Sequence, residues 1–190
     1  MTPTLMPYPD AASEEAIIAA TKTWVERAVI GLNLCPFAKS VFVKKQVRYA
    51  LTAATTADEL LAELEQELTR LAETAPEEMD TTLLIHPLVM TDFLDFHFFL
   101  AEADALIRNL GFEGVFQIAS LHPRYEFAGS EADDIANFTN RSPYPTLHIL
   151  RESSIDRAVA AFPDAESIFE RNIETMERLG HEGWKKLWLS

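Results

Sequence analysis

Two apolar runs that each end in His-Pro constrain the fold of this chain more than any other feature. Residues 81–85 lead directly into His86, residues 114–121 lead into His122, and a proline follows each histidine. Between the runs, apolar residues recur every three or four positions up to Gly111, which predicts a helix. Strands joined by such a helical crossover usually run parallel. Both histidines are therefore predicted to leave the sheet at the same edge, where ligands of α/β sheets tend to bind.

The rest of the chain alternates in the same way between helical and strand patterns. Apolar spacing and capping residues predict helices and strands in the order α-β-α-β-α-β-loop-β-α-α, with strands at 41–51, 81–85, 114–121 and 146–150. This order predicts an α+β (or α/β) fold, with a mixed sheet of about four strands, βαβ crossovers and flanking helices. Residues 1–12 hold three prolines and are predicted to form a mobile tail, and 13–190 a single domain.

Charge and composition limit the cellular compartments and the classes of binding partner that we expect for this chain. The chain has one cysteine, no signal-peptide pattern in its first residues and no run of about 18 apolar residues, so we expect a cytoplasmic protein. The net charge of −14 repels nucleic acid backbones and anionic membranes, so neither is an expected partner. A small anionic molecule remains the expected partner, and the oligomeric state stays open.

Cys35 is the first candidate for chemistry. It follows the predicted end of a helix at Gly31, and Pro36 suits the first position of a new helix, which would make Cys35 the N-cap. A helix N-terminus lowers the pKa of a cysteine, and Lys39 would add to this effect. The spelling resembles the Cys-Pro-Phe/Tyr element of glutaredoxin-like proteins, but it follows a helix here and Ala38 replaces the second cysteine. The alternative is a buried structural cysteine.

His86 and His122 are the next candidates. Either imidazole can act as a general base near neutral pH. With Cys35 they would also form a Cys-His-His set for a transition metal with one open position, although their spacing matches no zinc signature. The alternative is that both histidines are structural hydrogen-bonding groups.

The segment from His122 to His148 is the richest in polar side chains. Long irregular connections inside compact domains are often functional. Arg124 and Arg141 suit a bidentate clamp on a carboxylate or phosphate, and the predicted substrate-binding set is Arg124, Tyr125, Asn140, Arg141 and His148. The alternative is a well-packed loop whose arginines pair with Glu126, Asp133 or Asp134.

Three motifs in these segments resemble a known family. Residues 31–38 read Gly-Leu-Asn-Leu-Cys-Pro-Phe-Ala, residues 122–129 read His-Pro-x-Tyr-x-Phe-Ala-Gly, and residues 140–148 read Asn-Arg-Ser-Pro-Tyr-Pro-x-Leu-His. They are similar to the motifs of an uncharacterised bacterial family, with plant relatives, of unknown function, and the similarity spans about 24–179. The resemblance implies one domain with these three segments as its hallmark. It implies no mechanism.

Three hypotheses of function follow. The leading one is a small-molecule enzyme in which Cys35 is a thiolate nucleophile or redox thiol and His86 or His122 is the base. Arg124, Asn140 and Arg141 would then hold an anionic group of the substrate. The second is a metal-binding protein that uses Cys35, His86 and His122. The third is a non-catalytic binding or accessory protein whose motif residues only build the scaffold.

Overall fold

The protein is built around one mixed sheet of four strands, seen in a computed structural model that describes residues 13–162 and 167–188. The strands are β1 (Val47–Leu51), β2 (Thr81–Ile85), β3 (Phe116–Leu121) and β4 (Thr146–Arg151), in the order β1-β2-β4-β3. β1 and β2 are parallel, whereas β4 is antiparallel to both β2 and β3. β2 and β3 therefore run in the same direction with β4 between them. The predicted α+β class is confirmed.

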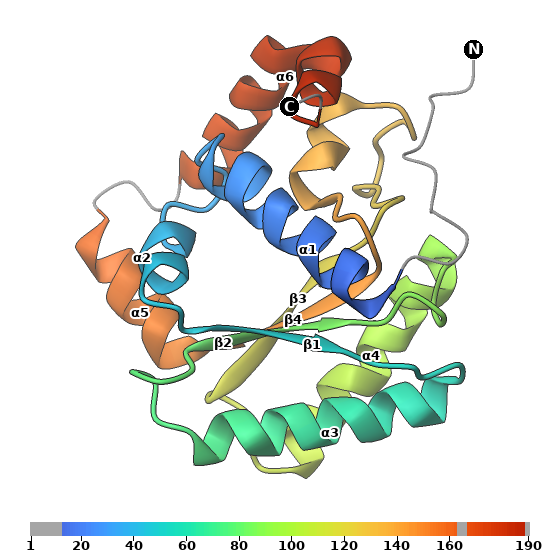
Figure 1. The fold of residues 1–190 in the computed structure, drawn as a ribbon, viewed down its shortest axis with the longest axis vertical. Coiled ribbons are helices and arrows are strands. Elements are labelled where there is room, and N and C mark those ends of the chain that lie inside the picture. The colour runs from blue at the N-terminus through green and yellow to red at the C-terminus, as the bar shows by residue number, and fades with distance from the viewer. Residues whose placement is uncertain (1–12, 163–166, 189–190) are drawn as a thin grey trace.

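Helices cover both faces of this sheet (Figure 1). α3 (Ala57–Glu73) and α4 (Phe93–Asn109) pack on one face over a core that includes Leu60, Leu64, Phe96 and Phe99. The other face carries α1 (Glu14–Trp24) with its π-helical continuation η1 (Val25–Ile30), and α6 (Ile168–Lys186). Two shorter helices, α2 (Ala38–Val43) and α5 (Glu152–Ala161), lie near each other at one end of the sheet, and a 3-10 helix, η2 (Ile135–Asn140), packs under α6.

Local sequence signals explain where several helices begin. Ser13 accepts a hydrogen bond from the Ala16 N–H and caps α1, and Asp92 accepts from Leu94 and Asp95 and caps α4. At α3, Thr56 and Glu59 form the capping box that their spacing predicts. These caps satisfy N–H groups that a helix leaves unpaired, so the starts of the helices are encoded locally.

Three predicted elements differ from the structure. The strand expected over 41–51 begins only at Val47, because 38–43 form α2 instead. The pattern of the last helix predicts an end at Gly180, but the helix continues past this residue, where a φ of 63° kinks it. Ser153 or Ser154 was the predicted cap of the preceding helix, but α5 begins at Glu152. The sequence also predicts Asp164 as the cap of the last helix, and both this residue and the expected tail over 1–12 lie outside the described residues.

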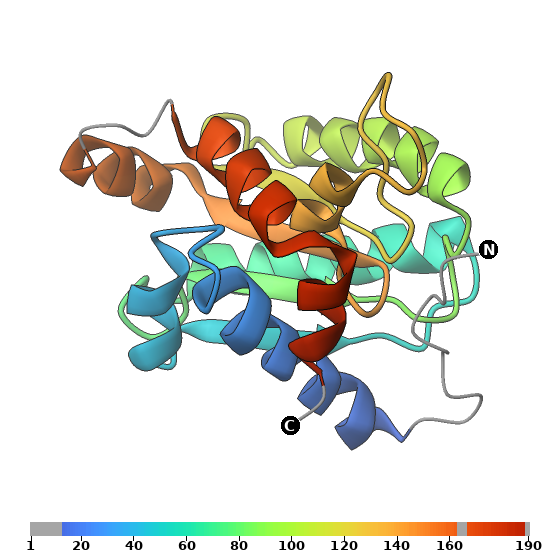
Figure 2. The ribbon, with the colours of Figure 1, turned by 90° about the horizontal axis from the view of Figure 1, so that it is seen from above.

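The two ends of the sheet hold different segments. β2 and β3 end together at one edge, which we call the histidine edge because His86 and His122 follow these strands. The opposite end holds the 31–37 segment and the end of α5. These two segments are in contact through the rings of Phe37 and Phe162, whose centroids lie 6.0 Å apart. Figure 2 shows α6 crossing above the sheet from α5. The residues predicted to be functional are thus divided between these two ends of the sheet.

Candidate functional site

His86 and His122 lie at the same edge of the sheet, and both are fully buried. Each ring nitrogen that points to a carbonyl must be the N–H donor: His86 Nδ1 donates to Val89 at 3.0 Å and His122 Nε2 donates to Met90 at 3.2 Å. The other nitrogen of His122, Nδ1, accepts from the Arg124 backbone N–H at 3.0 Å. His122 is therefore a neutral imidazole with both nitrogens occupied.

An aromatic ring separates the two histidines. Phe96 of α4 lies 5.5 Å from the His86 ring and 5.3 Å from the His122 ring. Burial lowers the pKa of both histidines to about 4, and the nearby His122 lowers the pKa of His86 further. His86 Nε2 is buried and finds no hydrogen-bond partner among the described residues. Neither imidazole reaches solvent, which argues against a general base that meets a substrate.

Arg124 holds the loop that both histidines touch. Its guanidinium donates to the Thr91 carbonyl at 2.6 Å and lies 3.4 Å from an Asp92 carboxylate oxygen. Met90 in this loop has a φ of 54°, an unfavourable left-handed conformation for a side chain of its size. The hydrogen bonds from His86, His122 and Arg124 to successive carbonyls stabilise this strained turn.

The 122–145 loop uses its remaining polar side chains in the same way. Arg141 donates to the Tyr125 and Ala132 carbonyls at 3.1 and 2.6 Å and lies over the Phe138 ring. The backbone carbonyl of Asn140 accepts a hydrogen bond from the backbone N–H of His122, and its side-chain amide donates to the Ser120 carbonyl at 3.4 Å. The Tyr125 ring packs between two phenylalanines, Phe93 and Phe127. The predicted clamp arginines thus hold backbone carbonyls of the loop, and the Arg124 side chain is also about half exposed.

Asn137, which sequence reasoning missed, organises the centre of this loop. It is fully buried, and its amide accepts from the Phe127 N–H and the Ser130 hydroxyl and donates to the Glu131 carbonyl. A buried amide that satisfies three loop groups replaces the sheet or helix bonds that irregular backbone lacks. Its role is to shape the loop.

His148 lies in the middle of β4, away from the histidine edge. Its register partners are Leu83 in β2 and Ala119 in β3. The Thr81 hydroxyl donates to the Ile149 carbonyl, so His148 Nε2 is the donor in its 2.8 Å bond to that hydroxyl. Burial lowers the pKa of His148 to about 4. It is a neutral structural histidine within the sheet.

Cys35 lies at the other end of the sheet. Its segment leads through α2 to the start of β1, where the Gln46 carbonyl receives the N–H groups of Asp80 and Thr81 at the start of β2. The structure therefore does not bring Cys35 to His86 and His122. Helix α2 begins at Ala38 with Phe37 as N-cap, so Cys35 is not the predicted N-cap.

The electrostatics of Cys35 also differ from the prediction. Burial raises the pKa of the thiol, and the N–H groups of Phe37 and Ala38 oppose that rise without cancelling it. Loss of hydration outweighs the short helix, so thiolate is disfavoured. No group of three His, Cys, Asp or Glu side chains in 13–162 or 167–188 is placed to hold a metal ion.

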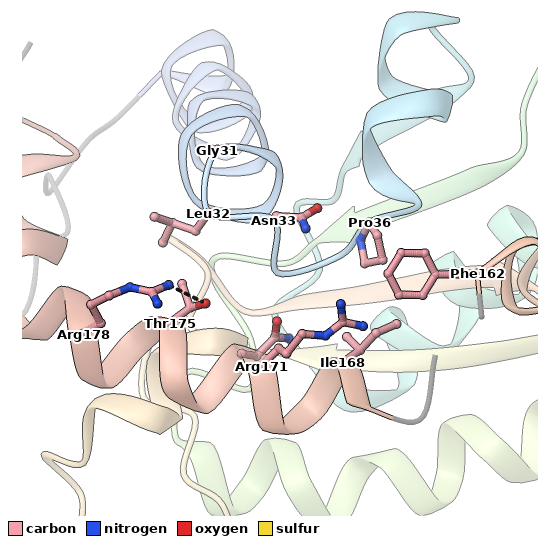
Figure 3. A pocket seen from close by; sticks show the side chains of 10 residues that line it. Gly31, Leu32, Asn33, Pro36, Phe162, Ile168, Arg171, Thr175 and Arg178 are labelled. Carbon is pink, nitrogen blue, oxygen red and sulfur yellow. Dashed lines mark hydrogen bonds between the residues drawn. The ribbon is translucent and has the colours of Figure 1, made fainter. Parts of the chain in front are cut away.

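A groove opens beside this segment, between the motif loop and the first half of α6 (Figure 3). We call it the α6 groove. Its volume is about 380 Å³, within the range of small-molecule sites. Its lining consists of Gly31, Leu32, Asn33, Pro36, Phe162, Ile168, Arg171, Asn172, Thr175 and Arg178.

Close packing positions the motif wall of the groove. A Cβ on Gly31 would collide with the Arg27 carbonyl, so only glycine lets the chain turn there. Asn33 follows with a φ of 55°, a left-handed conformation that asparagine tolerates. Across the groove, Asn172 of α6 donates to the Leu34 carbonyl at 2.9 Å and ties the two walls together.

The α6 wall supplies the charge that the sequence analysis did not identify. Arg171 and Arg178 are seven residues apart and both line the groove, with Thr175 between them (Figure 3). Arg178 donates to the Thr175 hydroxyl at 3.4 Å. The i, i+4, i+7 spacing of these three residues was the available signal, because it places them on one helix face.

The fold and the groove define a mixed α+β protein with a groove lined by two arginines at one end of its sheet and buried histidines at the other. None of the helices in the described part of the chain is long and apolar enough to span a membrane. The chain belongs to the DUF1415 family, a protein family of unknown function, whose profile matches residues 16–186. Comparison with curated proteins and with solved structures gave no match.

Proposed function

We propose that this protein binds a small organic anion in the α6 groove. The observation that carries the proposal is the placement of hydrogen-bond donors: Arg171 and Arg178 face the groove from one side of α6, with the Thr175 hydroxyl between them. The chain as a whole has a net charge of −14. Two guanidinium groups on one helix face give an anion a local place to bind in an acidic protein, while the surrounding field repels larger polyanions.

The lining favours binding over catalysis. The lining residues that the structure describes contain no carboxylate, imidazole or thiol, which are the usual acids, bases and nucleophiles. Arginine, threonine and asparagine side chains instead donate hydrogen bonds, as recognition of carboxylate or phosphate requires. This supports the non-catalytic hypothesis, with an anion as the ligand.

Titration with inorganic phosphate tests the proposal, with isothermal calorimetry and the shift in melting temperature as readouts. We expect the wild type to bind phosphate in the millimolar range, as suits one or two solvent-exposed arginines. Arg178→Gln should lose most of this binding without a lower melting temperature, because its side chain is exposed.

Arg108→Gln is the matched control. Arg108 is an exposed helical arginine on α4, on the opposite face of the sheet, and its loss changes the net charge by the same amount. Equal phosphate affinity in both variants would mean that the response reflects overall charge, and the proposal would be abandoned.

A further inference from the structure

The apolar end of the α6 groove is built around one aromatic ring. Phe162 packs its ring at 88° to that of Phe37, and the Arg171 guanidinium lies 5.0 Å from the centroid of the Phe162 ring. A guanidinium is planar, stacks well on aromatic faces and is less strongly hydrated than an ammonium group. Arg171 is thus held against a ring that is itself fixed by its neighbour.

The surroundings of this end suit a flat ring. Pro36 and Ile168 add apolar surface beside Phe162. Figure 3 shows the Pro36 and Phe162 rings side by side above Arg171. A flat ring can contact this apolar surface and the face of the guanidinium together.

The other end of the groove differs in chemistry. Arg178 and Thr175 supply a guanidinium and a hydroxyl there, and Arg178 lies about 10 Å along the helix from Arg171 at 1.5 Å per residue. This separation matches a ligand with its anionic group at one end and its ring at the other.

We infer that the ligand joins a planar ring to an anionic group, with the ring against Arg171 and Phe162 and the anion at Arg178 and Thr175. This inference rests on the proposed function. Aryl phosphates, aromatic carboxylic acids and nucleoside monophosphates share this chemistry, and a groove of about 380 Å³ is large enough for each.

Calorimetry with three probes on the full chain tests the inference: inorganic phosphate, phenyl phosphate and cyclohexyl phosphate. We expect phenyl phosphate to bind about fivefold more tightly than cyclohexyl phosphate, because only a flat ring stacks on a guanidinium. In Arg171→Lys, which keeps the charge but not the plane, this preference should disappear while inorganic phosphate still binds. In Arg178→Gln, all three probes should weaken.

The outcomes separate the two ideas. If inorganic phosphate binds through Arg178 but the phenyl group adds nothing over cyclohexyl, the inference is overturned and the proposed function stands. If none of the probes binds, both fail. If phenyl phosphate binds as expected, AMP and 3-phenylpropionate are compared next. Tighter binding of AMP would indicate a nucleotide ligand, and tighter binding of 3-phenylpropionate would indicate an aromatic acid.

Discussion

The two ends of the sheet use the same kinds of side chain in opposite ways. At the histidine edge, His86, His122 and Arg124 donate to carbonyls of one strained loop, with both imidazoles buried and the Arg124 side chain about half exposed. In the α6 groove, Arg171 and Arg178 line an open surface. The comparison teaches that residue type does not identify a site. What differs is the surroundings of these groups, because both imidazoles are buried at the histidine edge, whereas the two arginines of the α6 groove are exposed.

A fall in pH should lower the free energy of unfolding more than any of the substitutions that follow, because it acts on buried histidines at the histidine edge and in the sheet. His86, His122 and His148 each have a pKa near 4 when folded, against an ordinary value of 6.5. Between these values the unfolded chain binds protons that the folded chain does not, so stability falls as pH drops from about 6.5 towards 4. The loss is about 2 kcal/mol per histidine at pH 5. Urea unfolding at pH 7.5, 6 and 5 measures it, and a constant free energy of unfolding over this range would contradict it.

Removing one histidine should have the next largest effect. His122→Ala leaves the Met90 carbonyl and the Arg124 N–H without their partner and opens a cavity beside Phe96. We expect a loss of about 3 to 4 kcal/mol in the free energy of unfolding. His97→Ala is the control, because His97 is exposed on α4. Equal stability of the two variants would show that the buried bonds contribute little.

Arg124→Gln should cost less, about 1 kcal/mol, because the lost bond to the Thr91 carbonyl is at the surface. The same variant should bind phosphate as the wild type does. Chemical denaturation and calorimetry on one preparation give both values. A weakened phosphate affinity with unchanged stability would move the anion site to the histidine edge.

The smallest expected effect concerns the reactivity of the Cys35 thiol, which lies at the same end of the sheet as the α6 groove. A free thiol has a pKa of about 8.5. Because burial raises the pKa of the Cys35 thiol, its alkylation by iodoacetamide should have a midpoint at a higher pH than that of a free thiol. The pH profile of the alkylation rate on folded protein measures this. A midpoint below that of an unfolded control would restore Cys35 as a nucleophile.

The crossover between the two His-Pro runs could be predicted from sequence because it depends on local patterns. Strand length, the Asp92 cap and the helical period of 93–109 are all readable along the chain. The shared edge of His86 and His122 followed from these. Their burial did not, because it depends on Phe96 packing between the two rings.

The α6 groove could not be predicted in the same way. It exists because Asn172 meets the Leu34 carbonyl, a contact between residues 138 positions apart. Similarly, the β-branched and aromatic residues 41–43 suggested a strand, but they form the end of α2, in which no residue is buried. The motif at 31–38 is readable in the sequence, but its residue types point to Cys35, whereas the wall of the groove is formed by the path of its backbone.

Mapping the binding surface by nuclear magnetic resonance tests the central claim most directly. In a titration of ¹⁵N-labelled protein with phenyl phosphate, amide shifts should move at 31–36 and 168–178 and stay unchanged at 86–92 and 122–125. Shift changes confined to the histidine edge and the 122–145 loop would contradict the account.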